Sequence, residues 1–344
     1  MWYVGLDVGK RWHYVVVMNA LGQVAQQQKL PADPLVVRRF FETLEGPARV
    51  VLEATGHWMA VYDQVEAAVQ EVVLAHPLKV RAIASARIKT DRIDATTLAH
   101  LLRADLIPRA YIPPRAVRDW RELVRHRAFF VRLQTRVKNR VHILLAKQGI
   151  TPPSVSDLFG VAGLAWLQTV VLAEPYAAMR SRYLAVLAGL RTQLRAVEST
   201  ITITVQDTLE ARLLQTLPGV GRYLALLILG EVGEIARFPG PKQLVSYAGL
   251  CPSVYASGGA VRTGRLTKQG SSWLRWALVE AATHVPRSAT SRLGRLATRL
   301  IARRGVKTAR IAVARELCHA VFHVLRKAEP YRDPSSSLSA SGRS

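Results

Sequence analysis

The chain has 344 residues, which is enough for about two domains and a sizeable core. It carries 48 Lys and Arg residues against 24 Asp and Glu residues, a formal net charge of +24. This charge favours a polyanionic partner, with nucleic acid first, while the longest apolar stretches, such as "YLALLILG", are too short to span a bilayer.

The charge is spread unevenly along the chain. Residues 1–100 are nearly neutral, with 11 basic and 10 acidic residues. Residues 101–150 have 12 basic and 3 acidic residues, and residues 251–344 have 17 and 4. Such runs also occur on solvated helix faces, but this many like charges repel each other without a counter-charge. We therefore expect the two basic segments to hold nucleic acid.

Neither the cysteines nor the N-terminus indicates secretion. Cys251 and Cys318 lack the CxxC spacing of a ligand pair and fit a reducing cytoplasm, as small buried residues. The stretch "MWYVGLDVGK" places an acid where a signal peptide needs an apolar core.

Residues 1–108 predict a mixed α/β domain. Alternating and helical apolar spacings distinguish its strands from its helices. The expected elements are strands at 2–8, at 13–18 and from 24, a helix at 35–44, a strand at 48–54, a helix at about 58–69, a strand at 71–77 and a largely helical stretch at about 79–104. Three antiparallel strands followed by alternating helices and strands give a mixed sheet with helices on its faces, in the order of the ribonuclease H fold.

Residues 109–208 predict a basic helical arm. A helix is expected over 115–148, where ten Arg and Lys residues flank the apolar positions, and "ITPPSVSD" then breaks it. Residues from about 157 to 210 are expected to be helical again. Two long helices joined by a proline-rich turn favour an antiparallel pair or coiled coil, which could join two subunits or pack only within the chain.

Residues 209–330 predict a mostly helical domain. In "LLQTLPGVGRYLALLILGEVG", two helices flank Pro-Gly-Val-Gly, the helix-hairpin-helix signature. Gly219 and Gly221 would let the backbone approach a phosphate at the second helix's N-terminus. Residues 239–270 are expected to form a loop. Two helices follow ("SSWLRWALVEAATHV" and "ARIAVARELCHAVFHVLRK"), and residues 331–344 are expected to be a disordered tail.

Four acids occupy positions from which they could meet. Asp7 lies within the first strand and Glu53 near the end of the fourth, while Asp91 and Asp94 share a helix face in "KTDRIDA". Each acid alone fits surface charge or a helix cap, except Asp7, whose burial in an apolar strand costs several kcal/mol unless it is satisfied. Together they favour a site for Mg²⁺, with Mn²⁺ as the alternative, acting on a phosphodiester.

Other polar and aromatic residues carry weaker signals. Trp273 and Trp276 are three residues apart and are expected in the core rather than as base-stacking platforms. His57, His100 and His319 show no metal-ligand spacing and are expected to be structural.

Several motifs agree with one known family. "YVGLDVGK", "VVLEATG" and "KTDRIDA" resemble the N-terminal RuvC-like domain of the DEDD transposases of the "one-ten" insertion-sequence family, which includes the Piv-type DNA invertases. "LLQTLPGVG", "FPGPKQLVSYAGLCPSVYASGG" and "GRLTKQGSSWLRWALVEAA" resemble its C-terminal transposase domain. The resemblance covers about residues 1–325, in the family's order.

The resemblance implies a site-specific recombinase that moves a circularised element. It implies guidance by a bridge RNA from the element's non-coding end, which pairs with both target and donor DNA. It also implies that a serine attacks DNA to form a phosphoserine linkage. The matching position is Ser257 in "YASGG", with Ala256 where relatives commonly carry a charged residue and Ser253 nearby. The four carboxylates match Asp7, Glu53, Asp91 and Asp94.

Basic residues in both charged segments are expected to contact nucleic acid. Those after the serine could hold the scissile phosphate or the RNA backbone, and the sequence does not separate these uses. The candidates are Arg262, Arg265, Lys268 and Arg275 near the serine, and Arg125, Arg132, Arg136 and Arg140 in the helical arm. The expected partners are donor and target DNA, the bridge RNA and further copies of the chain in a dimer or tetramer. No membrane is expected, and the location is the bacterial cytoplasm near the nucleoid.

Two other functions use the same features. A RuvC-type nuclease or junction resolvase would use the four acids with water as the nucleophile, and would not need Ser257. A non-catalytic nucleic-acid-binding protein would need none of the acids. A C-terminal domain beyond the carboxylate domain speaks against both.

Overall fold

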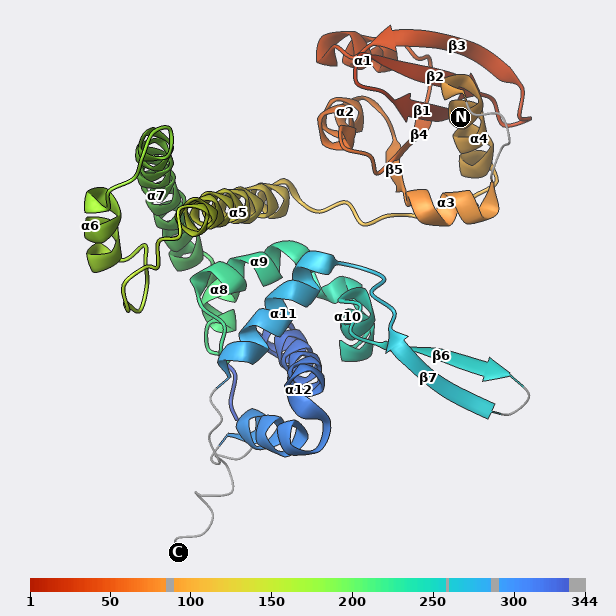
Figure 1. Ribbon diagram of the computed structural model, residues 1–344. Coiled ribbons are helices and arrows are strands. Elements are labelled where there is room, and N and C mark those ends of the chain that lie inside the picture. Colours follow the sequence, from red (N-terminus) through yellow and green to blue (C-terminus); the bar gives the residue numbers. More distant parts are fainter. Residues whose placement is uncertain (85–89, 258–259, 286–290, 334–344) are drawn as a thin grey trace, which may run out of the picture. The chain divides into compact units, whose positions relative to one another are not determined.

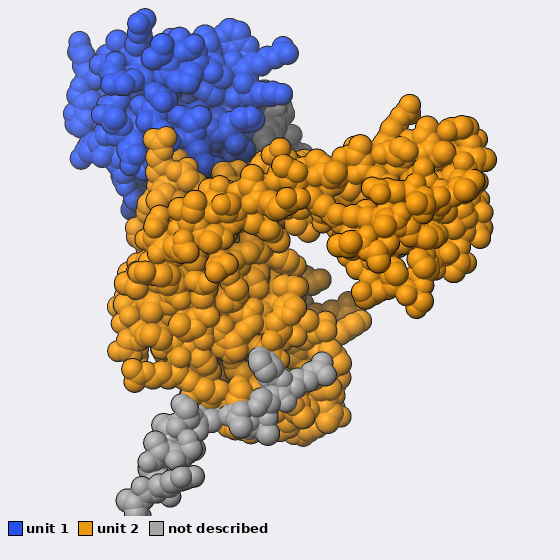
Figure 2. All heavy atoms as spheres, turned by 90° about the vertical axis from the view of Figure 1, so that its left-hand side faces the viewer, with its two compact units in different colours: residues 1–112 blue, residues 113–344 orange. Residues whose placement is uncertain are grey.

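The computed structural model describes residues 1–84, 90–257, 260–285 and 291–333. The chain forms two compact units, Met1–Ile112 and Pro113–Ser344 (Figure 2). Part of the predicted helical stretch (85–89) and most of the predicted disordered tail (334–344) lie outside the described residues.

The first unit is a mixed five-stranded sheet with helices on both faces, as predicted (Figure 1). The strand order is β3-β2-β1-β4-β5. β1 pairs antiparallel with β2 and β2 with β3, whereas β1 pairs parallel with β4 and β4 with β5. The elements are β1 (Trp2–Val8), β2 (Trp12–Met18), β3 (Val24–Pro31), α1 (Pro34–Glu42), β4 (Ala48–Glu53), α2 (Trp58–Val65), the 3₁₀ turn η1 (Glu66–Ala68), β5 (Glu71–Ala75), α3 (Pro77–Ile83) and α4 (Asp91–Arg103).

Alternation along β1 and β4 divides the sheet's core between its two faces. On one face Val4, Leu6, Val50 and Leu52 pack with the buried side chains of α1 and α2. On the other face Val51 and its neighbours pack with the buried leucines of α4. Because side chains alternate between the two faces along a strand, the residues of β1 and β4 that directly precede or follow these four point toward α4.

In its described residues, the second unit is helical apart from one hairpin. Its elements are α5 (Arg115–Lys147), α6 (Val161–Thr169), α7 (Tyr176–Asp207), α8 (Leu209–Leu214), α9 (Arg222–Val232), the 3₁₀ turn η2 (Ile235–Arg237), α10 (Pro241–Tyr247), β6 (Pro252–Ser257), β7 (Ala260–Leu266), α11 (Ser272–His284) and α12 (Arg292–Lys327). Within α12 the backbone leaves the helical conformation at Gly305.

The two long helices α5 and α7 form the antiparallel pair predicted from sequence. In the first half of α5, Arg127 forms an ion pair with Glu198 in the second half of α7 at 2.8 Å. Near the end of α5, Val141 and Leu145 share a core cluster with Leu187 from the first half of α7. The predicted helix over 157–210 is interrupted, because residues 170–175 separate α6 from α7.

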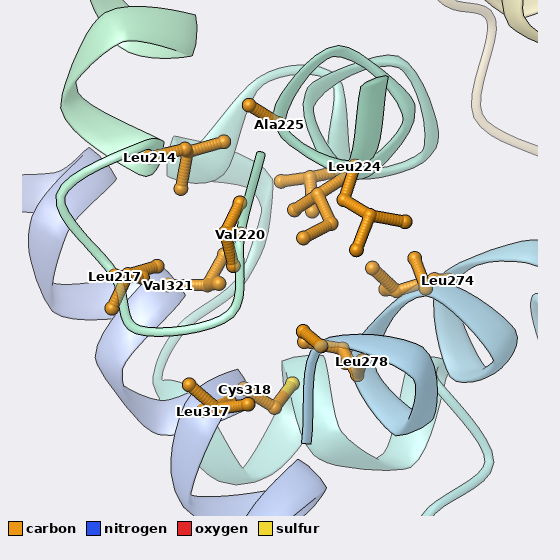
Figure 3. Close-up of a cluster of buried hydrophobic side chains, with 14 of the residues drawn as sticks. Leu214, Leu217, Val220, Leu224, Ala225, Leu274, Leu278, Leu317, Cys318 and Val321 are labelled. Carbon is orange, nitrogen blue, oxygen red and sulfur yellow. The ribbon is translucent and has the colours of Figure 1, made fainter. Parts of the chain in front are cut away.

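The largest core cluster lies among α8, α9, α11 and α12 (Figure 3). Leu214, Leu224, Leu278 and Val321 come from these four helices in turn. The residues of α9 from Leu224 to Val232 are all buried, so this helix is the centre of the unit. Cys318 belongs to the same cluster, as predicted for a small buried residue, and burial raises the pKa of its thiol to about 12.

The expectation of a loop over 239–270 is wrong. This stretch forms α10, whose Leu244 and Val245 are buried, and the antiparallel hairpin of β6 and β7. Pro241 suits the first turn of a helix because its missing N–H would be unpaired there in any case. The glycine-, serine- and proline-rich stretch that predicted a loop instead contains the start of a helix and a pair of strands.

Candidate active site and nucleic-acid interface

Asp7 and Glu53 lie at the carboxyl ends of neighbouring parallel strands, on the same face of the sheet. The register pairs Leu6 of β1 with Leu52 of β4, so the two acids occupy the next positions along these strands. Because Leu6 and Leu52 pack toward α1 and α2, the acids point to the opposite face, which α4 covers. Both acids are half-buried.

The helix α4 presents Asp91 and Asp94 in its first turn. Thr90 caps the helix, since its hydroxyl accepts a hydrogen bond from the Ile93 N–H at 3.2 Å. Acids in the first turn are favoured by the exposed N–H groups and dipole of the helix end. Asp91 is exposed, whereas Asp94 is half-buried beside the buried Ala95.

The direction of α4 brings its first turn toward the carboxyl end of β1. Arg103, at the helix's last turn, donates to the Ala20 carbonyl at 3.3 Å, just past the β2 residue that pairs with Tyr3. The last turn therefore lies beside the start of β1, and the helix runs antiparallel to this strand. Its first turn must consequently lie toward the strand's other end.

A close contact fixes the level at which the helix crosses the strand. A Cβ atom added at Gly5 would lie 1.9 Å from the Ala95 carbonyl oxygen, so only glycine lets α4 pack so closely. The strand rises about 6.6 Å from Gly5 to Asp7. The helix rises about 6 Å from Ala95 back to Asp91. The first turn of α4 is therefore level with Asp7, which brings all four predicted acids to one face and one edge of the sheet.

The donor chemistry of this edge suits a hard divalent cation. All four groups are carboxylates, the oxygen ligands that Mg²⁺ prefers. Among the residues that the structure describes, no three His, Cys, Asp or Glu side chains lie close enough to hold one metal ion. The four acids thus lie on one face of the sheet but do not form a preassembled metal-binding site.

Ser257 lies in the second unit, as the last residue of β6. Its backbone pairs with Ala260 of β7, two positions along the strands from the pair of Tyr255 with Arg262. The hairpin projects from the helical body of this unit (Figure 1). The alternative serine, Ser253, is half-buried, and its Oγ would lie 2.4 Å from a Cβ added at Gly264 of the opposite strand.

The basic residues predicted around the serine differ in their surroundings. Arg262 and Arg265 on β7 are exposed, as is Lys268, which adopts a left-handed backbone conformation with φ of 54°. Arg275 is half-buried, and its Nη1 donates to the Ala248 carbonyl at 3.3 Å, so it also anchors the end of α10. The exposed three lie on or just after the hairpin.

The two glycines of the Pro-Gly-Val-Gly turn have different surroundings. Gly219 has φ of 80°, and a Cβ atom there would lie 2.2 Å from the Ala281 carbonyl oxygen in α11. This face of Gly219 is therefore used for packing within the protein. Around a Cβ atom at Gly221 there is open space, and Gly221 is the N-cap of α9.

The four arginines predicted in the helical arm lie on one side of α5, at intervals of seven and four residues. Arg132, Arg136 and Arg140 are exposed. Arg125 is different, because its Nη2 donates to Glu231 Oε1 at 2.8 Å.

The sequence analysis did not single out Glu231. This residue is only 4% exposed. Its carboxylate also accepts a hydrogen bond from Ser271 Oγ at 2.7 Å, and its carbonyl accepts one from Arg121 Nη2 at 3.3 Å. An acid within the apolar run "YLALLILGEVG" was the available signal. Glu231 ties α5 and the start of α11 to α9.

The prediction that Trp276 lies in the core is wrong, because its side chain is 43% exposed. Trp273 is partly buried against the core, as predicted. The predicted structural histidines His57 and His100 are exposed, and His319 is half-buried.

Comparison with known proteins identifies the family. The model of the IS116/IS110/IS902 transposase family matches residues 211–296. A second transposase model, that of the DEDD transposases of IS110 type, matches residues 4–149. The chain belongs to this transposase family. The resemblance read from the sequence motifs is thereby confirmed, and the protein is an enzyme that cuts and rejoins DNA rather than a non-catalytic binding protein.

The transposase is also similar in sequence to named relatives over most of its length. It is 27% identical to the y4qE protein of Sinorhizobium fredii, which carries the name of a transposase, over 95% of this chain and 89% of that protein. It is 26% identical to the transposase for insertion sequence element IS1111A of Coxiella burnetii, over 82% and 79%. It is 25% identical to the transposase for insertion sequence element IS1328 of Yersinia enterocolitica, over 86% of each. None of the transposase's described helices has the length and apolar character to cross a bilayer.

Proposed function

We propose that this transposase is a site-specific recombinase, guided by a bridge RNA, that joins DNA through a covalent phosphoserine. The observation that carries the proposal is the placement of Asp7 and Glu53 at adjoining strand ends, facing the first turn of α4. The strand order β3-β2-β1-β4-β5, antiparallel and then parallel, supports a RuvC-like form of the ribonuclease H fold for residues 1–108.

The four acids Asp7, Glu53, Asp91 and Asp94 would hold the divalent ions, Mg²⁺ first and Mn²⁺ as the alternative. When bound, these ions would orient and activate the oxygens on either side of a scissile phosphate. The carboxylates' own part is to hold the ions at the sheet edge and to take the proton that the nucleophile loses. The support is their shared face, shared level and all-oxygen donor set.

Ser257 is the proposed nucleophile. Its Oγ forms a bond to the scissile phosphorus, the bond from phosphorus to one DNA oxygen breaks, and that oxygen leaves as a hydroxyl after taking up a proton. The serine's own proton passes to a carboxylate. In the reverse sense, a DNA hydroxyl attacks the phosphoserine and releases Ser257, so no ATP is needed to rejoin the strands. Arg262, Arg265 and Lys268 would neutralise the phosphate during both steps.

Nucleic acid would be gripped by the other basic surfaces. We assign residues 109–208 to an arm that binds nucleic acid through Arg132, Arg136 and Arg140, and that joins copies of the chain in a dimer or tetramer. We assign residues 209–330 to the transposase domain, with α8, the Pro-Gly-Val-Gly turn and α9 as a helix-hairpin-helix. The open space around Gly221, at the N-cap of α9, supports phosphate binding there.

The decisive experiment looks for a covalent protein–DNA adduct. Purified protein, RNA transcribed from the element's non-coding end, labelled donor and target DNA and Mg²⁺ are combined and separated on a denaturing gel. We expect an adduct that maps to Ser257 by mass spectrometry. It should vanish in Ser257→Ala and in Asp7→Asn, whereas Ser253→Ala is the matched control and should retain it.

A second function uses the same acids without the serine. A RuvC-type nuclease would cut with water as the nucleophile and leave free ends. Metal-dependent cutting without an adduct, by a Ser257→Ala protein as active as the wild type, would replace the recombinase proposal with this one. Omitting the RNA tests guidance separately, because an unguided enzyme would form the same products without it.

A further inference from the structure

Three aromatic rings gather where α5, α9 and α11 meet in the second unit. Trp273 and Trp276 of α11 have ring centroids 6.4 Å apart, with ring planes at 88°. Tyr223 of α9 lies 6.2 Å from Trp276, with planes at 67°. We call these three residues the aromatic platform. Edge-to-face pairs of this kind are favourable and hold the rings in a defined order.

Two of the rings are fixed from below. Trp273 and Tyr223 pack against the main core cluster of the unit. The Tyr223 hydroxyl also donates to the Val124 carbonyl of α5 at 3.2 Å. Trp276 rests on both rings and is 43% exposed. A large aromatic side chain is therefore held rigidly with much of its surface in solvent.

Arginines from α5 border the platform. The Arg127 guanidinium lies 4.4 Å from the Tyr223 ring centroid, and the Arg132 guanidinium lies 5.1 Å from that of Trp273. Arg127 is already held by Glu198, whereas Arg132 is exposed and begins a row that continues with Arg136 and Arg140. Successive exposed arginines at four-residue intervals form a positive row leading away from the rings.

We propose that Trp276 stacks on an unpaired base of a single-stranded nucleic-acid segment, whose phosphates follow Arg132, Arg136 and Arg140. An exposed aromatic beside a positive row is the pairing that single strands need, since bases stack on the ring while the backbone is neutralised. A protein partner would bury the ring equally well, but the row of arginines favours a polyanion. A duplex would leave Trp276 unused, because its bases are already stacked on one another.

The inference deepens the proposed function, in which the single strand is an unpaired part of the guide RNA or a displaced DNA strand. A binding assay with the full-length protein separates the sources and the chemistry. Fluorescently labelled single strands of one sequence, as RNA and as DNA, are titrated alongside the duplex and a single strand that carries abasic sites. Trp276→Ala should weaken binding of at least one intact single strand by about tenfold or more. Trp276→Phe should retain most of the affinity.

The chain offers a matched control in Trp12, which is 47% exposed and has Lys29 Nζ 5.1 Å from its ring centroid. Trp12→Ala should leave binding unchanged. Trp276→Ala should also leave the affinities for the duplex and for the abasic strand unchanged, and should not alter the salt dependence of binding. Arg136→Gln should instead reduce the slope of log affinity against log salt concentration by about 1.

A loss of affinity in Trp276→Ala for single-stranded RNA, for single-stranded DNA or for both supports stacking and identifies the nucleic acid that is bound. Unchanged affinity for both intact strands overturns the inference, as does an equal loss for the abasic strand or the duplex. The proposed function is tested apart from this, because formation of the phosphoserine adduct reports on Ser257 and the acids. If the wild-type protein forms the adduct but Trp276→Ala has no effect on binding, the proposed role of the aromatic platform is wrong and the proposed function stands.

Discussion

Glu231 makes a strong prediction about stability because its two partners are so unequal in exposure. Its side chain is 5% exposed, and that of Arg125 is 37% exposed. Removing Arg125 would leave a buried carboxylate with Ser271 as its remaining side-chain donor. Removing the charge of Glu231 would instead leave an arginine that can turn toward water. The two changes should therefore differ in cost.

The magnitudes follow from that asymmetry. Arg125→Met keeps the apolar stem and removes the charge, and breaking a buried pair in this way costs about 3–5 kcal/mol. Exposure of Arg125 reduces this to about 2–3 kcal/mol. Glu231→Gln keeps a side-chain acceptor for Ser271 and should cost about 1 kcal/mol. The double variant, which has no buried charge, should be more stable than Arg125→Met alone.

Thermal melting of the full-length protein, followed by circular dichroism, measures this order. For a unit the size of residues 113–344, about 1 kcal/mol corresponds to a shift of about 2–4 °C. Arg125→Met should lower the transition by about 5–10 °C, Glu231→Gln by about 2–4 °C and the double variant by an intermediate amount. If the double variant falls by the sum of the two single shifts, the side chains are not coupled and the reasoning fails.

Three further predictions concern single positions. Gly219→Ala should destabilise the second unit by about 2 kcal/mol or more, because its φ is positive and the added Cβ meets backbone. Gly221→Ala should cost only about 0.5–1 kcal/mol, because Gly221 is an N-cap with open space around an added Cβ, and equal melting temperatures would contradict this difference. Burial, together with nearby His57, holds the pKa of His13 below its usual value of 6.5, so the unfolded chain binds a proton that the folded chain does not. The melting temperature of the first unit should therefore fall as the pH drops below 6.5. The substitution His13→Phe should remove that dependence on pH. Alkylation followed by mass spectrometry should label Cys251 well before Cys318, whose thiol has a pKa of about 12, and the opposite order would show that the core opens readily there.

Much of the candidate active site could be predicted because its residues sit on regular elements. Asp7 and Glu53 interrupt strongly apolar runs. Because side chains alternate along a strand with a period of two residues, the sequence predicts which residues lie on the same face as each acid. Asp91 and Asp94 follow a helix cap at Thr90. The face and edge shared by these acids then follow from strand order.

Other parts were misjudged because local composition does not report packing. The glycine- and proline-rich stretch over 239–270 became α10 and a hairpin, since buried Leu244 and Val245 outweighed the turn residues. The spacing of Trp273 and Trp276 predicted two core residues, but only Trp273 turns toward the core. Helical spacing tells which residues share a face, and not how far a neighbouring helix covers it.

By itself, the sequence determined the element order of residues 1–108, the helical arm, the transposase family and the two basic segments. These follow from periodicity, motif and charge, which are properties of residues near one another in the chain. Only the tertiary structure decided that α4 crosses β1 at Gly5, that Glu231 joins three helices through Arg125 and Ser271, and that Trp276 stays in solvent. Each of these depends on contacts between residues far apart in the chain, which no local pattern encodes.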